Sequence, residues 1–286
     1  MISYVFCSGF FPKAIFILII TMEKNLWQQV QLVRQKSPLV HNITNYVVMN
    51  NTANALLAAG ASPIMAHAKS EIREMINIAH SVVINIGTLD EYWSESMLMA
   101  AETANAIHKP WVLDPVGAGA TSFRDQILHQ LLQFHPTVIR GNASEIIALA
   151  KINTTVTKGV DSTAESNDAV EAAQILVQQY NTIVCISGET DIILSPNQSI
   201  QIKNGHSLMT KVTGLGCSAS ALAGAFIAVA EDKAAGIAAV MSLLGIAGEL
   251  AVRESKGPGS LQVNLIDKLY NMTEEEFISH LKIEKS

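Results

Sequence analysis

The segment Thr213-Gly214-Leu215-Gly216-Cys217 stands directly before a run rich in helix-forming residues that begins at Ser218. Two glycines in three residues let the backbone approach a ligand closely or adopt a positive φ. The backbone amides that open the following helix point outward, where the helix dipole is positive, and this geometry suits a phosphate or another oxyanion. The segment therefore predicts an anion cradle. A glycine turn that leads into a buried helix is the alternative interpretation.

Cys217 lies at the mouth of this predicted cradle. A thiol at a helix N-terminus tends to have a lowered pKa, so we expect thiolate character there. A small buried cysteine is an equally good interpretation of these residues alone. With Cys7 and Cys185 it makes three cysteines, which are too few and too scattered for a disulfide framework or a cysteine-rich zinc site. Reduced thiols in a cytoplasmic protein are the expectation.

The composition indicates a well-buried α/β protein. Of 286 residues, 49% are apolar and only 15% are charged, which fits one large domain and does not fit a disordered chain. The net charge of −6 comes without a basic block, so neither nucleic acid nor a membrane surface is an expected partner. An acidic protein can still bind a nucleotide through a helix terminus and a metal ion.

Residues 1–21 are strongly apolar, and their only charge is Lys13. They lack the positively charged start and the clear cleavage site of a signal peptide, and their apolar run is short for a bilayer span. We expect an apolar N-terminal extension that results from an over-long start, with the working protein beginning at Met22. A weak membrane anchor is the alternative. No linker, repeat or low-complexity tract divides residues 22–286, which predict a single domain.

Short β-branched runs alternate with helical patterns along the chain. This alternation predicts βαβ units and a mostly parallel central sheet with helices on both faces. Strands are predicted at residues 81–86, 111–113, 137–140 and 182–186, and a strand leads into a loop at residues 62–67. Helices are predicted near residues 50–60, 70–80, 93–107, 122–134, 143–151, 165–179, 218–230, 233–253 and 273–282.

Two further segments have less regular patterns. Residues 192–195 and 199–202 predict an antiparallel hairpin at an edge of the sheet. Residues 37–45, Ser-Pro-Leu-Val-His-Asn-Ile-Thr-Asn, are dense in amides and hydroxyls before a helix rich in small residues. They predict either a polar pocket wall that contains Asn42, or a capping and turn segment.

Polar groups follow the predicted strands at the edge where parallel α/β sheets bind their ligands. Asp114 ends one strand and Glu145 stands just inside the next helix, so the two carboxylates can converge on one Mg²⁺ that bridges phosphates. Asn142 and Glu145 also have the spacing of a capping box, which is an equally good interpretation. Arg140 can clamp a phosphate or pair with a surface carboxylate.

Six ordered motifs together resemble the hydroxyethylthiazole kinase family of the ribokinase-like superfamily, over about residues 30–270. These motifs are His41-Asn-Ile-Thr-Asn45, Ser62-Pro-Ile-Met65, Asp114-Pro-Val-Gly117, Arg140-Gly-Asn-Ala-Ser-Glu145, Ser187-Gly188 and Thr213-Gly-Leu-Gly-Cys217. The resemblance implies a three-layer ribokinase-like fold and a phosphotransferase that acts on an alcohol. Its substrates would be ATP, with Mg²⁺, and 4-methyl-5-(2-hydroxyethyl)thiazole, in thiamin biosynthesis or salvage. It also implies a homotrimer with thiazole sites between subunits.

The resemblance also implies roles for individual positions. Cys217 stands where the wider superfamily has an aspartate base, and a cysteine there is usual for thiazole kinases. Leu215 replaces a residue that is often Thr or Ala, which leaves the backbone role unchanged. The matched positions are Met65 and Gly214 with Asn42 for the thiazole, Arg140 and Ser187 with Asn142 for ATP, and Asp114 and Glu145 for Mg²⁺.

Other functions stay open on the sequence alone. The same scaffold could carry an ATP-dependent hydratase-repair lyase or a kinase for another small alcohol, such as a hydroxymethylpyrimidine. A non-catalytic thiazole- or nucleotide-binding protein would lack Asp114, Glu145 or Cys217, and the chain has all three. The chain contains no Walker A motif, so an ATP site would have to be built on another scaffold.

Overall fold

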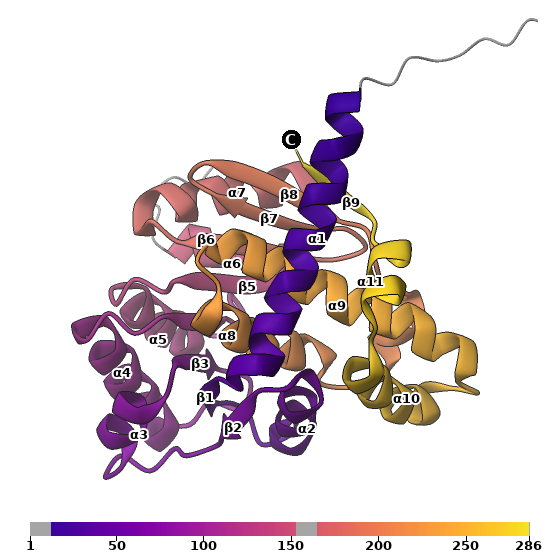
Figure 1. Cartoon of the computed structure of the whole chain (residues 1–286). Coiled ribbons are helices and arrows are strands. Elements are labelled where there is room, and N and C mark those ends of the chain that lie inside the picture. Colours follow the sequence, from indigo (N-terminus) through magenta and orange to yellow (C-terminus); the bar gives the residue numbers. More distant parts are fainter. Residues whose placement is uncertain (1–12, 153–164, 286) are drawn as a thin grey trace, which may run out of the picture.

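The computed structural model describes residues 13–152 and 165–285. In these residues a nine-stranded sheet has the order β2-β1-β3-β4-β5-β6-β7-β8-β9 (Figure 1). Neighbouring strands pair in parallel from β2 to β6 and antiparallel from β6 to β9, which confirms the predicted α/β fold with a mostly parallel sheet. The strands are β1 Leu39–Ile43, β2 Ser62–Ile64, β3 Ser81–Asn85, β4 Trp111–Asp114, β5 Val138–Asn142, β6 Ile183–Ser187, β7 Asp191–Ser195, β8 Gln198–Ile202 and β9 Ile283–Lys285.

Helices cover both faces of this sheet, so the molecule has three layers (Figure 1). One face carries α1 Lys13–Lys36, α2 Met49–Ala59, α8 Leu215–Val229, α9 Lys233–Glu254, α10 Pro258–Asn271 and α11 Glu274–His280. The other carries α3 Ile72–Ile78, α4 Glu91–Ala106, α5 Ser122–Leu132, α6 Ala143–Ile152 and α7 Glu165–Tyr180. A 3₁₀ turn, η1 Ser207–Lys211, connects the sheet to α8.

The alternation of side chains along each strand divides the interior into two cores. On β3, Val83 packs with the α8 and α9 side, whereas Val82 and Ile84 pack with the α4 side. This period of two follows from the pleat of a strand. Strands buried on both faces must be apolar at almost every position, which is why the sequence pattern revealed them.

Helix α8 lies unusually close to the sheet because its inner face is made of small residues. A Cβ on Gly224 would stand 2.5 Å from Val83 Cγ2. The Ser81 hydroxyl also donates to the Gly224 carbonyl at 2.7 Å. The close packing fixes the N-terminus of α8 over the carboxyl ends of the central strands, where a ligand site is expected.

Two expectations need correction. Residues 39–43 form strand β1, which lies between β2 and β3, and do not form a turn segment; the polar side chains of His41 and Asn42 on this strand are buried. The hairpin of β7 and β8 is antiparallel as predicted, but it is not at the edge, because β9 pairs with β8 beyond it. The start at Met22 stays a prediction: α1 passes through this position, and residues 1–12 lie outside the described residues.

The helix α9 fits its place in the core. Among residues 13–152 and 165–285, it is the one helix long and apolar enough to cross a membrane by length and composition. Its most apolar window is 83% buried inside the protein, and the core helix of a globular protein passes the same test.

Candidate active site

The first turn of α8 has the features of an anion cradle. Gly214 caps the helix with φ +81, a left-handed conformation that favours glycine. A Cβ at Gly214 would also stand 2.5 Å from Val48 Cγ1. No side chain caps this helix, and within the described residues no protein acceptor bonds the backbone N–H groups of residues 215–217. These amides stay available for a ligand, as the sequence predicted.

Arg140, in the middle of β5, stands beside this turn. Its Nη1 donates to the Gly216 carbonyl at 2.9 Å, and its Nε is buried without a hydrogen-bond partner in the described residues. Arg140 therefore binds the cradle itself and not a surface carboxylate, which was the alternative interpretation. Its positive charge lies next to the free amides, and both attract an anion.

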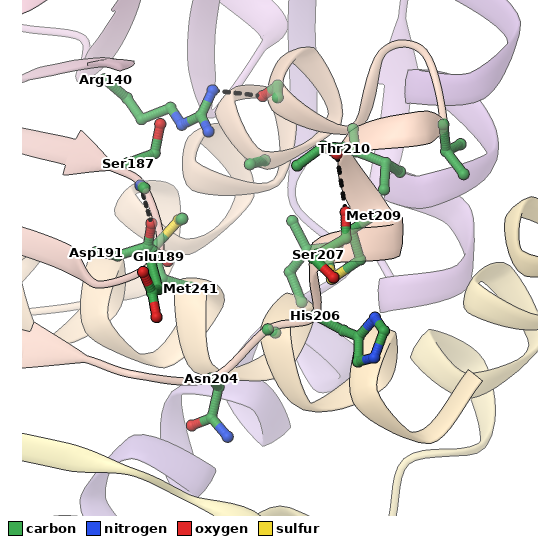
Figure 2. A pocket seen from close by; sticks show the side chains of 18 of the residues that line it. Arg140, Ser187, Glu189, Asp191, Asn204, His206, Ser207, Met209, Thr210 and Met241 are labelled. Carbon is green, nitrogen blue, oxygen red and sulfur yellow. Dashed lines mark hydrogen bonds between the residues drawn. The ribbon is translucent and has the colours of Figure 1, made fainter. Parts of the chain in front are cut away.

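A cavity of about 1040 Å³ opens in front of the cradle, large enough for a nucleotide. Figure 2 shows Arg140 and Ser187 on one wall and the segment from Asn204 to Thr210 on the other. Helix α9 lines the back of the cavity through Gly245. It packs closely against the segment that begins at Asn204, because a Cβ on Gly245 would stand 2.7 Å from the Asn204 backbone oxygen. Of the predicted site residues, the structure brings Arg140, Ser187 and Gly214 into this cavity.

Asp114 ends β4 and is 2% exposed. Burial, together with a smaller effect of the Glu145 charge, raises the pKa of its carboxyl to about 6, although the charge of Arg140 and hydrogen bonds from Ser220 and Asn85 oppose the rise. Asn85 Nδ2 donates to Asp114 Oδ2 at 2.6 Å. The electrostatic coupling with Glu145 and Arg140 shows that the structure brings these predicted residues together.

Cys217 lies in the first turn of α8, half-buried, as predicted. The expectation of thiolate character is wrong. Burial raises the pKa of the thiol above its usual value, and the charge of Asp114 raises it further, although hydrogen bonds from Asn85 and Asn45 and the charge of Arg140 oppose the rise. Loss of water outweighs the helix terminus here, so Cys217 is a thiol at neutral pH.

Asn142 and Glu145 form the capping box that was the alternative to a metal site. The Glu145 amide donates to Asn142 Oδ1 at 2.9 Å, and the Asn142 amide donates to Glu145 Oε2 at 2.9 Å. Glu145 Oε1 also accepts from the Gly117 amide at 3.0 Å, which ties the loop after β4 to α6. The capping role is therefore real, and it holds the carboxylate in place where its charge acts on Asp114.

The donor set around Asp114 and Glu145 fits Mg²⁺. The Glu145 charge raises the pKa of Asp114, so a cation beside Asp114 would be favourable, and Mg²⁺ takes one or two carboxylates and completes its shell with water and phosphates. Among the described residues no group of three or more His, Cys, Asp or Glu side chains could hold a metal. The residues therefore fit an ion that arrives with phosphates, not a caged structural metal.

The structure does not bring two predicted substrate residues into the cavity. Met65 follows β2, at the opposite edge of the parallel part of the sheet, and is half-buried. Asn42 is 1% exposed on β1, and both polar atoms of its side chain are enclosed without a partner in the described residues. The role of Asn42 in binding the thiazole stays a prediction, and its buried amide does not line the cavity.

Three polar residues of the site escaped the sequence interpretation. Asp191, at the start of β7, lines the cavity and accepts from the Gly188 amide at 3.1 Å, and burial raises its pKa to about 6. Asn85 ends an apolar strand, where no pattern marks it. Asn45 belongs to the motif at residues 41–45, but its contact with Cys217 is visible only in the fold.

Comparison with known proteins decides the family. The hydroxyethylthiazole kinase family model matches residues 30–275. The chain belongs to the hydroxyethylthiazole kinase family. A hydroxyethylthiazole kinase of Syntrophus aciditrophicus (strain SB) is 53% identical to this family member over 261 residues, 91% of this chain and 97% of that protein. One of Vibrio campbellii is 52% identical over 92% of this chain and 99% of its own length.

Solved structures agree with this hydroxyethylthiazole kinase family assignment. The hydroxyethylthiazole kinase of Pyrococcus horikoshii OT3 superposes with a TM-score of 0.84 at 43% identity, over 92% of this chain and 99% of that chain. A pyridoxal kinase of Staphylococcus aureus, in complex with AMP-PCP, has a TM-score of 0.64 at 15% identity and covers 87% of this chain and 98% of that chain. The second likeness shows the shared ribokinase-like fold alone.

Proposed function

We propose that this protein transfers the γ-phosphoryl group of ATP to the hydroxyl of 4-methyl-5-(2-hydroxyethyl)thiazole, in thiamin biosynthesis or salvage. Family membership supplies the reaction class. The main observation in this chain that supports the proposal is the first turn of α8, whose backbone amides are free. Arg140 lies beside this turn, and a cavity large enough for a nucleotide lies in front of it. ATP is the donor, and the residues proposed for it are Arg140, Ser187 and Asn142.

The cradle explains the phosphoryl transfer. The substrate oxygen attacks the γ-phosphorus, the bond from that phosphorus to the bridging oxygen breaks, and ADP leaves with the electron pair. The transition state is loose, so catalysis consists mostly of positioning and charge stabilisation. The free amides of residues 215–217 are fixed before the reaction and bind the equatorial oxygens, as an oxyanion hole does.

Asp114 and Glu145 are the residues that would hold Mg²⁺. The ion would neutralise charge on the triphosphate. Each carboxylate also accepts a hydrogen bond from the protein. Glu145 accepts one from the Gly117 amide and Asp114 accepts one from the Asn85 side-chain amide, so both carboxylates are held in place before any ligand arrives.

Cys217 orients the substrate hydroxyl or accepts its proton late in the transfer. A neutral thiol is not a base, so in this form Cys217 orients the hydroxyl through its sulfur lone pairs, and only the thiolate form accepts the proton. Orientation suffices because a loose transition state needs little activation of the nucleophile. Gly214 lies close to Val48 and lines the cavity, which supports a role for it in binding the thiazole beside the phosphate.

The separation of Met65 from the cavity supports a homotrimer with thiazole sites between subunits. Exposed apolar side chains cluster near Asn45 and on α2: Tyr46 is 58% exposed, Val47 63% and Leu57 56%. Such a surface fits burial against another subunit. Sedimentation equilibrium should give three times the chain mass; a monomer at micromolar concentration would contradict the trimer. A cytoplasmic location for the working protein, residues 22–286, is part of the same proposal.

Product identification tests the function directly. We expect the purified protein, given ATP, Mg²⁺ and hydroxyethylthiazole, to form a phosphate monoester of the thiazole alcohol, seen by mass spectrometry and by ³¹P resonance. Release of inorganic phosphate with no phosphorylated thiazole would instead indicate a hydrolase or the repair lyase.

A further inference from the structure

We propose that Asn45 is a positioning residue for Cys217, and that Asn85 and Gly87 fix the direction of its amide. The proposal rests on the proposed function, since it concerns the group that faces the substrate hydroxyl. Asn45 follows β1, Asn85 ends β3, and Cys217 lies in the first turn of α8. The three come together only in the folded protein, since Asn45 and Asn85 are 40 residues apart and Cys217 is 172 residues from Asn45.

The orientation of the Asn85 amide is fixed by its partners. Its Oδ1 accepts from the Gly87 amide at 2.9 Å and from Asn45 Nδ2 at 2.9 Å. Its Nδ2 donates to Asp114 Oδ2 at 2.6 Å. A flipped amide would place an NH₂ group against two N–H donors and an oxygen against a carboxylate. Only one orientation satisfies all three neighbours.

Asn85 in turn fixes the Asn45 amide. The nitrogen of Asn45 carries two hydrogens, and the structure uses both: one reaches Asn85 Oδ1, and the other points at Cys217 Sγ, 3.4 Å from the nitrogen. Flipping Asn45 would set its oxygen against the oxygen of Asn85. Asn45 is 5% exposed and Asn85 1%, so water does not compete for these bonds. The sulfur therefore receives an N–H hydrogen bond from Asn45. Asp114 fixes the Asn85 amide, Asn85 fixes the Asn45 amide, and the direction of this hydrogen bond follows.

Gly87 supplies an independent constraint on the same side chain. A Cβ at Gly87 would stand 2.6 Å from Asn45 Nδ2, 2.8 Å from its Cγ and 2.9 Å from its Cβ. Real atoms do not approach so closely, so any side chain at residue 87 would push Asn45 out of place. The absence of a side chain lets Asn45 lie flat against the backbone and reach Cys217.

This arrangement gives Asn45 a function in the reaction. The N–H bond occupies one side of the sulfur and leaves the other side to the substrate hydroxyl. It also favours negative charge on the sulfur and so opposes the effect of burial on the thiol. Asn45 touches Cys217 and not the reacting atoms in this structure, so it acts through the cysteine.

Two variants remove the contact by different routes. Asn45→Ala deletes the donor, and Gly87→Ala keeps the donor but displaces it. We expect each to lower kcat for thiazole-dependent ADP release about tenfold, the effect of one lost hydrogen bond, while KM for ATP stays within twofold. Asn25→Ala, at an exposed position of α1, and Gly259→Ala, which has open space around it, are the matched controls and should leave kcat unchanged.

A double-mutant cycle separates positioning from general structural support. In a Cys217→Ala background, Asn45→Ala and Gly87→Ala should cause no further loss of kcat, because the residue through which they act is gone. Losses that multiply in the double variants, or single variants with normal kcat, would overturn the proposal. If Asn45→Ala lowers the melting temperature severely, Asn45→Asp, which keeps the shape and removes the donor, replaces it.

A crystal structure provides a readout that does not depend on turnover. The wild-type protein should show the Asn45 amide between Asn85 and Cys217, and Gly87→Ala should show it displaced from the sulfur. An Asn45 side chain turned away from Cys217 in the wild type would overturn the proposal. Failure of the proposed function appears differently, as a wild-type protein with this geometry that does not phosphorylate the thiazole.

Discussion

Arg140 Nη1 donates a 2.9 Å hydrogen bond to the carbonyl oxygen of Gly216, so strand β5 holds the first turn of helix α8 in place. The contact is tight, because a Cβ on Gly216 would stand 3.0 Å from the same nitrogen. One residue thus supplies a positive charge to the anion site and also fixes the backbone that forms it.

Arg140→Lys tests this double role. An ammonium cannot reproduce the planar fork of the guanidinium, so it cannot both hold the Gly216 carbonyl and face a phosphate. We expect KM for ATP to rise at least tenfold, with a smaller change in KM for the thiazole. Arg73→Lys, on the exposed surface of α3, is the control. Unchanged ATP kinetics in Arg140→Lys would show that the charge alone matters.

Gly214→Ala tests the cradle. Alanine at φ +81 is strained, and its Cβ would meet Val48 at 2.5 Å, so the first turn of α8 must shift. We expect kcat/KM to fall by about 10²-fold, the size seen when one oxyanion-hole donor is lost. Gly259→Ala should retain full kcat/KM. Steady-state kinetics with circular dichroism as a fold check would decide; a folded Gly214→Ala protein with normal kcat/KM would remove the cradle from the mechanism.

Cys217 substitutions test the thiol. We expect Cys217→Ala to lower kcat by about 10²-fold, the low end for general base catalysis, because the amides still bind the phosphoryl group. Cys217→Asp should keep activity, since a carboxylate orients the hydroxyl and accepts its proton. A Cys217→Asp protein that is folded and binds thiazole but is inactive would contradict the assignment.

The pH dependence follows from Asp114 and Asp191. Burial raises the pKa of both carboxyl groups to about 6, so each is ionised above that pH and neutral below it. Protonated Asp114 is a poor ligand for Mg²⁺, and protonated Asp191 holds the Gly188 amide less well. We expect kcat/KM to fall as the pH drops below about 6 while the fold, followed by circular dichroism, persists. A constant kcat/KM from pH 8 to pH 5 would contradict this.

Much of the fold could be predicted from the sequence, because strands buried on both faces must be apolar and β-branched. Strand β1 escaped because His41 and Asn42 interrupt its apolar pattern. Strand β9 escaped because its sequence, Ile283-Glu-Lys, is a short edge strand without an apolar run. The hairpin was placed at the edge for the same reason, since the pattern of β8 gives no sign of a partner from the C-terminus.

The ordered motifs pointed to Arg140, Ser187 and Gly214, which line the cavity, but not to the contacts between residues of different motifs. Asn85 lies in a run of apolar residues, and only the register of β3 with β4 places it beside Asp114. The thiolate character of Cys217 was predicted from the helix terminus alone. Its real environment includes the burial and the Asp114 charge that packing adds, and these effects depend on segments distant in sequence.

The most direct test of the central claim is ADP release by protein beginning at Met22, with ATP, Mg²⁺ and hydroxyethylthiazole, compared with a hydroxymethylpyrimidine under the same conditions. The account predicts turnover that depends on the thiazole and is much slower with the pyrimidine. A folded protein that binds ATP but releases no thiazole-dependent ADP would contradict it.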